Sequence, residues 1–140
     1  MREVILESDR ETFAQIFAYS IRKKDHEKML SVMRRLGRIH KNHGSLEMRL
    51  YVWGEEAFLH GFDEIGKLLG VSSNDDLWLE INCYEDSSQQ KKALSLMKRD
   101  RKALIAWEEL QKLTGPGRTM YVGEFDRLSV GRNYLNSSKL

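Results

Sequence analysis

Four polar side chains that can carry chemistry fall in two short segments of alternating polar and apolar residues. Glu47 and Arg49 lie two residues apart in the first segment, and Glu80 and Tyr84 lie four apart in the second. A carboxyl group buried in a pocket has a raised pKa and can act as a general acid or base. We therefore take these four as candidate catalytic residues. The alternative that we favour is structural, with Arg49 paired to a glutamate inside an interface.

Aromatic, amide and imidazole groups near the same segments are candidates for contacting a ligand. The pocket-binding candidates are Tyr51, Trp78, Asn82 and His40. Their rings can stack on a flat substrate, or they can pack inside a protein interface. We favour the second interpretation.

Metal and cofactor chemistry has little support in the sequence. His40 and His43 lie three residues apart, but a third ligand is missing, because Glu47 belongs to the following strand. Histidines at this place are commonly a feature of a helix C-terminus. A haem site needs a histidine on a helix that lines the pocket, and the second helical region, residues 87–113, contains none. We expect no metal and no cofactor.

The first half of the chain predicts a strand, a helix and a second strand. Residues 12–21 are rich in aromatic and β-branched residues and predict a strand. Asp25 has the position of a helix N-cap, apolar residues then recur at helical spacing, and Gly44 marks the end of the helix. Residues 45–53 alternate with a period of two, as a strand does.

The second half predicts the same order after an acidic connection at residues 54–76, which holds a short helix that ends at Gly70. Residues 77–84 alternate as a strand. Ser87 to Gln90 has the spacing of a capping box, and a helix follows to Leu113, with a possible break in the basic stretch 98–102. Residues 114–117 end it, residues 119–126 predict the last strand, and 129–140 form a polar tail.

This order predicts an α+β fold of ferredoxin-like βαββαβ type, with a four-stranded antiparallel sheet and its helices on one face. We expect one domain, 1–140, with its core in about 12–128. The apolar rows of the two alternating strands should face the helices. These rows are Leu46, Met48, Leu50 and Val52, and Leu77, Leu79, Ile81 and Cys83. Cys83 would then be an inert core thiol.

The other rows should share the opposite face of the sheet. They are Glu47, Arg49, Tyr51 and Trp53, and Trp78, Glu80, Asn82 and Tyr84, together with Tyr121 and Phe125. So many large aromatic side chains rarely face water, and they usually mark an interface or a ligand groove. We expect two copies to pack these faces together as a homodimeric barrel with a partly polar interior.

Three segments, 43–47, 97–101 and 117–125, resemble the dimeric α/β-barrel superfamily, and within it the YbaA-like proteins of unknown function. The resemblance covers about 13–128. It implies the barrel dimer but no particular chemistry, because the superfamily includes cofactor-free monooxygenases, haem-degrading enzymes, muconolactone isomerases, stress-responsive proteins and NIPSNAP-like proteins. The long connection after Trp53 departs from this family's pattern.

Composition narrows the class of protein. The 140 residues are 41% hydrophobic and 31% charged, with a net charge of +2 and one cysteine. These values are typical of a globular protein in a reducing compartment, and no stretch has the length of a signal peptide or a membrane span. We expect a cytoplasmic protein. The basic stretch 21–41 lacks a nucleic-acid motif, so nucleic acid ranks last among partners.

Two functions of different class follow. The first is a protein that binds or transforms a small molecule in a sheet-lined pocket, resembling at most a cofactor-free monooxygenase. The second is a non-catalytic dimeric module whose second face is only an interface.

Overall fold

The computed structural model of the chain describes residues 10–54, 59–115 and 120–128. The strands are β1 (Phe13–Arg22), β2 (Glu47–Val52), β3 (Asp75–Tyr84) and β4 (Met120–Asp126). The helical segments are η1 (Lys23–Asp25), α2 (His26–Asn42), α3 (Ile65–Leu68), α4 (Ser87–Met97) and α5 (Arg101–Thr114). None of the helices in these described residues is both long and apolar enough to cross a membrane.

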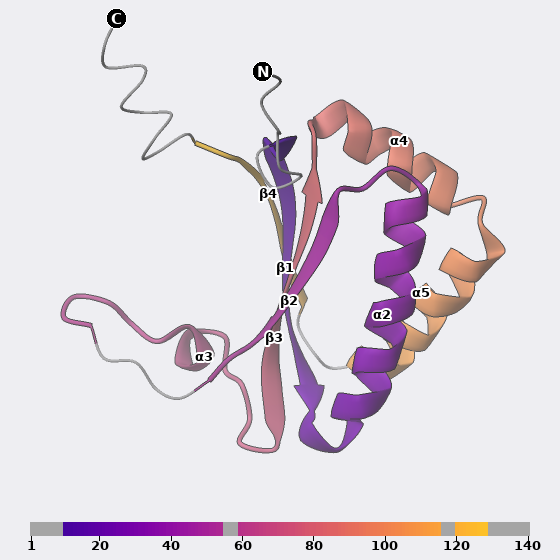
Figure 1. Cartoon of the computed structure of the whole chain (residues 1–140). Helices are drawn as coiled ribbons and strands as arrows, with labels where there is room; N and C mark the ends of the chain where they lie inside the picture. The colour runs from indigo at the N-terminus through magenta and orange to yellow at the C-terminus, as the bar shows by residue number, and fades with distance from the viewer. Residues whose placement is uncertain (1–9, 55–58, 116–119, 129–140) are drawn as a thin grey trace, which may run out of the picture.

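The four strands form one sheet in the order β2-β3-β1-β4, and every neighbouring pair is antiparallel. Figure 1 shows this sheet edge-on, with α2, α4 and α5 all on one side of it. The predicted α+β fold is confirmed, and the predicted second helix consists of two, α4 and α5. We call the sheet face that α2, α4 and α5 leave uncovered the open face.

Helix α2 begins and ends close to the predicted residues. Asp25 is its N-cap residue, but the side chain makes no capping hydrogen bond and instead lies 3.6 Å from Nε of Arg22. One turn of 3-10 helix, η1, connects β1 to this start. The chain leaves the helix through Gly44, whose φ of 102° suits a residue without a Cβ.

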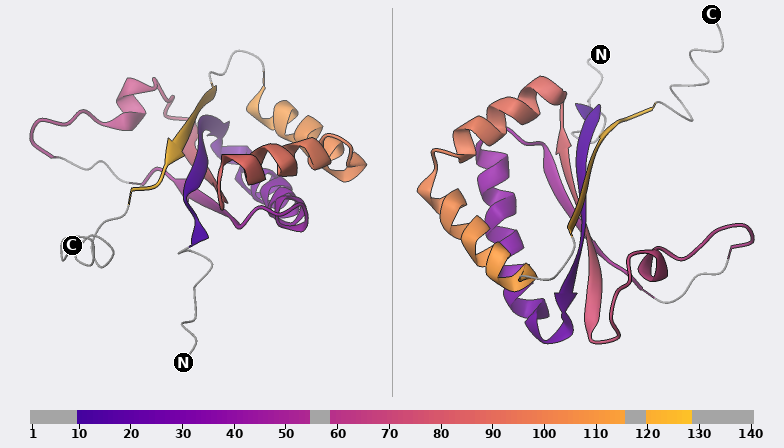
Figure 2. Two further views of the ribbon diagram at one scale, coloured as in Figure 1. Left: turned by 90° about the horizontal axis from the view of Figure 1, so that it is seen from above. Right: turned by 180° about the vertical axis from the view of Figure 1, so that it is seen from behind.

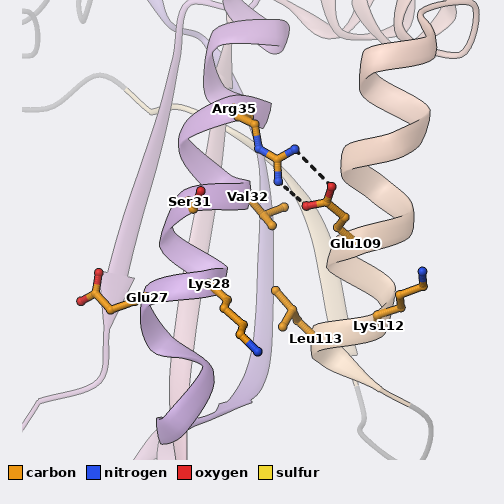
Figure 3. A pocket seen from close by; sticks show the side chains of 8 residues that line it. All are labelled: Glu27, Lys28, Ser31, Val32, Arg35, Glu109, Lys112 and Leu113. Atoms are coloured by element: carbon orange, nitrogen blue, oxygen red, sulfur yellow. Dashed lines mark hydrogen bonds and ion pairs between the residues drawn. The ribbon is translucent and has the colours of Figure 1, made fainter.

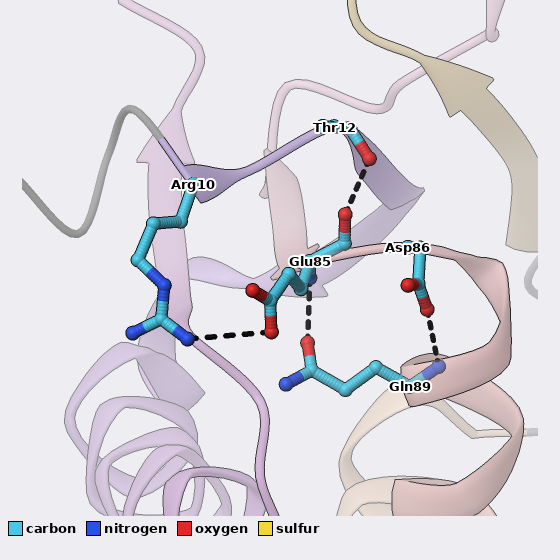
Figure 4. A network of polar contacts seen from close by, with 5 residues as sticks. All are labelled: Arg10, Thr12, Glu85, Asp86 and Gln89. Carbon is cyan, nitrogen blue, oxygen red and sulfur yellow. Dashed lines mark hydrogen bonds and ion pairs between the residues drawn. The ribbon is translucent and has the colours of Figure 1, made fainter. Parts of the chain in front are cut away.

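The N-cap residue of helix α4 is Asp86, one residue before the predicted Ser87 (Figure 4). Oδ1 of Asp86 accepts a hydrogen bond from the backbone N–H of Gln89 at 2.7 Å, and the Gln89 side chain accepts one from the backbone N–H of Glu85 at 2.5 Å. The Thr12 hydroxyl donates to the Glu85 carbonyl, and Arg10 forms an ion pair with the Glu85 carboxylate at 3.3 Å. These contacts connect the start of β1 to the start of α4.

The basic stretch does break the second helix, between Met97 and Arg101. Oδ1 of Asp100 accepts from the backbone N–H of Lys102 at 2.9 Å and so caps α5. The other carboxylate oxygen lies 2.8 Å from Nε2 of His43, at the end of α2. The Asp100 carboxylate at this break therefore connects the start of α5 to the end of α2.

The core lies between the helices and the covered face of the sheet. Its buried side chains come from β1, α2, β3, α4 and α5: Tyr19, Ile21, Met29, Val32, Met33, Leu36, Ile39, Trp78, Met97, Ala103 and Ala106. Truncation of Leu36 to alanine would cost about 2–5 kcal/mol of stability, because the side chain is fully enclosed.

The connection between β2 and β3 projects on the side of the sheet opposite the helices (Figures 1 and 2). We call its residues 59–70, which include α3, the arm. The ring of Trp53 lies so close to Gly66 that a Cβ at position 66 would be 2.4 Å from ring atoms. Gly70, with a φ of 65°, ends the arm as predicted.

Candidate functional site

The row Trp78, Glu80, Asn82 and Tyr84, which we call the β3 polar row, faces the helices. Tyr19 lies opposite Trp78 in the strand register, and both belong to the core beneath α2. Tyr84 packs with Phe13 and with Ala93 of α4. The prediction that this row shares a face with Glu47, Arg49 and Tyr51 is therefore wrong.

The complementary row of β3 occupies the open face. Leu79 lies opposite Tyr51 of β2, and Ile81 lies opposite Arg49. The predicted place of Leu77, Leu79, Ile81 and Cys83 against the helices is thus wrong as well. Alternation shows which residues share a face but not which face is covered, and both rows of β3 are apolar enough to be buried. For β2 the predicted sides are correct, since Met48 and Leu50 pack against the core beneath the helices.

Glu80 is the central polar group of the row, and only 6% of it is exposed. The Tyr19 hydroxyl donates to its Oε1 at 3.0 Å, and Nδ2 of Asn82 donates to its Oε2 at 2.7 Å. Burial raises the pKa of the Glu80 carboxyl, and the hydrogen bonds from Asn82 and Tyr19 oppose part of that rise. A carboxyl group with a raised pKa holds its proton more strongly than usual, which suits general acid–base chemistry.

Three buried polar atoms of the β3 polar row have no hydrogen-bond partner among the described residues. They are Nε1 of Trp78, Oδ1 of Asn82 and the hydroxyl of Tyr84. All three belong to the β3 polar row, on residues that are at most 1% exposed. Trp78 and Tyr84 lie six residues apart on one extended strand, so these atoms are spread along the row. Buried polar groups in proteins almost always have a partner, so each of the three can still make a hydrogen bond.

His40 is buried in the last turns of α2, and its Nδ1 also has no partner within the described structure. Burial, with a smaller effect from the charge of His43, lowers the pKa of His40 to about 4. The imidazole is therefore neutral at pH 7. It can donate or accept one hydrogen bond but carries no charge there.

His43 does not join His40 in a metal site, because its Nε2 binds Asp100. Hydrogen bonds from His43 and from the Lys102 backbone lower the pKa of the Asp100 carboxyl. Across residues 10–54, 59–115 and 120–128, no three His, Cys, Asp or Glu side chains are grouped closely enough to hold a metal ion.

Glu47 and Arg49 lie on the open face at the outer strand β2, apart from Glu80. Arg49 contacts Glu47 at 3.1 Å and Glu11 at 3.5 Å. The guanidinium thus pairs with glutamates of its own chain, which agrees with the structural alternative for Arg49. Cys83 lies next to this group, on the open-face row instead of the predicted helix-facing one; burial and a hydrogen bond with Glu11 raise the pKa of its thiol to about 12.

Large apolar side chains cover much of the rest of the open face. Tyr51, Tyr121 and Phe125 are each about half exposed. In the strand register Tyr121 lies opposite Ala18 and Phe125 opposite Ala14. The ring of Phe125 lies over Gly123, where a Cβ would be 2.7 Å from it. The open face is thus more apolar than predicted, because it carries Leu79 and Ile81 in place of Glu80 and Asn82.

Tyr19 is the site residue that the sequence analysis missed. It sits in the first strand, 61 residues from Glu80, and only the pairing of β1 with β3 brings the two together. The signal in the sequence was a tyrosine inside a predicted strand, but strand pairing cannot be read from alternation alone.

No protein-family model matches the chain, and no curated protein is similar to it in sequence. Several solved structures share its fold. A mutant of SnoaB, a cofactor-independent oxygenase from Streptomyces nogalater, superposes with a TM-score of 0.53 and 14% identity, over 86% of this chain and 96% of that one. The hydroxynitrile lyase of Passiflora edulis gives 0.51 and 8%, over 86% and 98%.

A NIPSNAP-family protein of unknown function from Agrobacterium tumefaciens has a TM-score of 0.49 at 16% identity, over 86% of this chain and 93% of that one. At such identities the likeness is one of fold alone. The chain has the α+β fold of the dimeric α/β-barrel structures. Since the two proteins above a TM-score of 0.5 have different activities, the fold does not choose a reaction.

Proposed function

We propose that the chain binds a small organic molecule at the β3 polar row and exchanges a proton with it through Glu80. The observation that carries this proposal is the buried Glu80 carboxyl, held by Tyr19 and Asn82 in a row that carries three polar atoms without partners among the described residues. A group held by two hydrogen bonds and shielded from water is well suited to act as a general base or acid.

The chemistry of the row indicates the kind of molecule. Nε1 of Trp78 and the hydroxyl of Tyr84 can each donate a hydrogen bond, and Oδ1 of Asn82 can accept one. A flat molecule with a weakly acidic O–H group would match these groups, with its proton moving to Glu80. We propose no metal or cofactor for this step, and the reaction resembles at most that of a cofactor-free monooxygenase. The similarity to SnoaB adds only that a cofactor-independent oxygenase can have this fold.

The test compares Glu80→Gln with Glu47→Gln. Glutamine at position 80 can still accept from Tyr19, and rotation of the Asn82 amide presents its free Oδ1 to the new N–H group, so the fold should persist. Native mass spectrometry of untagged wild type first identifies a retained molecule, and that molecule is then the probe.

We expect Glu80→Gln to keep binding the probe but to lose turnover by about 10²-fold or more. Glu47→Gln, on the open face, should match the wild type. Equal turnover in wild type and Glu80→Gln would contradict the acid–base role, and unchanged binding in Trp78→Phe, Asn82→Leu and Tyr84→Phe would contradict the site.

A second candidate, a non-catalytic homodimeric module, is favoured by a different observation. Tyr51, Tyr121 and Phe125 form a large apolar surface with the β3 row Leu79 and Ile81. Packing of two open faces would remove this surface from water. Dimer formation is compatible with the first proposal, but a protein that dimerises and never retains a ligand would be left with this second function alone.

Two further expectations belong to the proposal. The narrower resemblance to the YbaA-like proteins stays a prediction, as does a cytoplasmic location. A single buried cysteine agrees with a reducing compartment.

A further inference from the structure

The arm exposes four large apolar side chains that no described residue of its own copy covers. They recur every three residues, at Leu59, Phe62, Ile65 and Leu68, and they are 47–76% exposed. Single exposed apolar residues are ordinary, but four in ten residues usually mark an interaction surface. The packing of Trp53 on Gly66 fixes the base of the arm and holds this surface away from the sheet.

The arm is also acidic. The connection 54–76 carries six Asp or Glu residues and a single lysine. Next to Phe62 lie Asp63 and Glu64, and Oε2 of Glu64 is shielded from water without a partner among the described residues. A shielded carboxylate oxygen without a partner is unfavourable, and a lysine or arginine from outside the arm would stabilise it.

A groove of matching character runs between α2 and α5 on the far side of the molecule (Figure 3). Its first hollow, of about 550 Å³, has apolar Val32 and Leu113 in its wall and Lys28, Arg35 and Lys112 around it. A second hollow, of about 420 Å³, adjoins it at Arg35 and adds apolar side chains together with Arg38 and Lys102.

The charge of the helical layer supports an acidic occupant. In residues 26–42 and 87–114, Lys and Arg outnumber Asp and Glu by twelve to four, whereas the rest of the chain has eleven against seventeen. Of the two carboxylates in the groove, that of Glu109 is already bound by both nitrogens of Arg35 (Figure 3). Lys112 also lies 3.6 Å from Glu108 in an exposed pair, and the remaining cations Lys28, Arg38 and Lys102 outnumber the remaining groove carboxylate, that of Glu27.

The arm cannot enter the groove of its own copy, because the two lie on opposite sides of the sheet (Figures 1 and 2). We infer that the arm of one copy binds in the α2/α5 groove of a second copy of this chain. The exposed apolar side chains of the arm pack on the floor of the groove, and Asp63 and Glu64 approach Lys28 and Lys112. Since the arm and the groove lie on opposite sides of each copy, each contact leaves one arm and one groove free, so the copies join head to tail and the assembly grows with concentration. This inference does not depend on the chemistry of Glu80.

The test uses a zero-length carbodiimide cross-linker, which joins a carboxylate to a lysine amine only when the two touch. Equal amounts of ¹⁵N-labelled and unlabelled protein are mixed, cross-linked and digested, and the joined peptides are identified by mass spectrometry. We expect peptides of mixed isotope that connect 63–64 to Lys28 or Lys112. Absence of these peptides, or joined peptides of one isotope only, would overturn the inference.

Charge variants provide the matched control. Lys28→Glu/Lys112→Glu should abolish the cross-link and raise the dissociation constant of the head-to-tail contact in sedimentation equilibrium by about tenfold or more. Lys91→Glu/Lys92→Glu, the same change in charge on α4, should do neither. Adding Asp63→Lys/Glu64→Lys to the groove variant should restore the affinity, and equal affinity in all these variants would overturn the inference.

The contribution of the apolar side chains of the arm is tested separately. Phe62→Ser/Leu68→Ser changes side chains that are 73% and 76% exposed, so the fold of the single copy should be unchanged. We expect weaker head-to-tail association and unchanged binding of any probe at Glu80. A wild type whose assembly does not grow with concentration would contradict the arm contact without affecting the Glu80 proposal.

Discussion

The hydroxyl of Tyr19 donates a hydrogen bond of 3.0 Å to the carboxylate of Glu80, across two strands whose residues lie 61 positions apart in the sequence. Tyr19 lies opposite Trp78 in the register and therefore reaches Glu80 diagonally. Its hydroxyl also lies 3.9 Å from the sulfur of Met33 on α2. This contact places a titratable group under the helices, in the layer that ordinarily holds only apolar side chains.

We predict that Tyr19→Phe lowers the free energy of unfolding by about 1–3 kcal/mol, since it removes a donor from a buried carboxyl. The hydrogen bond from Tyr19 lowers the pKa of Glu80, so the variant should also raise that pKa further. Urea denaturation at pH 7 measures the first effect. Tyr51→Phe, on the open face, is the control and should change stability little; equal losses in the two variants would contradict a special role for the Tyr19 hydroxyl.

The lowered pKa of His40 predicts that the protein loses stability in acid. Its pKa in the folded state is about 4, against an ordinary value of 6.5, so the unfolded chain binds more protons between these values. Stability from this group is complete above pH 6.5 and falls as the pH decreases to 4, by about 3 kcal/mol in total.

The measurement compares urea denaturation of wild type and His40→Leu at several pH values in that range. Other groups, such as Asp100, titrate in both proteins and cancel in the difference. The stability of His40→Leu relative to wild type should rise as the pH falls, and a constant difference would show that His40 is protonated equally in both states.

We predict that Phe125→Glu prevents association through the open face. A carboxylate there would be buried without a partner when two apolar sheets pack together. In the Phe62→Ser/Leu68→Ser background, which removes the arm contact, native mass spectrometry should show a dimer for the parent and a monomer for Phe125→Glu, with an unchanged circular dichroism spectrum. Leu128→Glu, just beyond the end of β4, controls for the added negative charge, since the Leu128 side chain is 81% exposed. A fully dimeric Phe125→Glu protein would exclude the open face as the interface.

Gly66→Ala should release the arm from its base. A methyl group at position 66 would lie 2.4 Å from the ring of Trp53, so the ring has to move, at a local cost of about 1–3 kcal/mol. We expect faster hydrogen exchange in the arm and a shift in tryptophan fluorescence. Gly54→Ala is the matched control, because no atom lies within 4 Å of a Cβ there. Equal exchange in the two variants would contradict the contact.

Much of the fold was accessible from the sequence because local patterns encode it. The helical spacing of Met29, Val32, Met33 and Leu36 predicted α2, and the basic stretch before Arg101 marked the break between α4 and α5. The order of the elements then left few topologies, and the ferredoxin-like arrangement was correct.

The candidate site was only partly accessible. Glu80, Asn82, Trp78 and Tyr84 were singled out, but with the wrong neighbours, because they were placed beside Glu47 and Arg49. Alternation fixes which side chains of β3 go together, and hydrophobicity must then choose a side. The choice failed because the row Leu77, Leu79, Ile81 and Cys83 is the more apolar one and nevertheless lies on the open face.

By itself the sequence thus determined the helices, the strands and their order, since each depends on residues close together in the chain. Only the tertiary structure decided which row of β3 lies under the helices and that Tyr19 meets Glu80. The physical reason is that register and sidedness come from the joint packing of β1, β3 and α2. A buried carboxyl in a hydrogen-bonded pair results from that packing, and no local pattern specifies it.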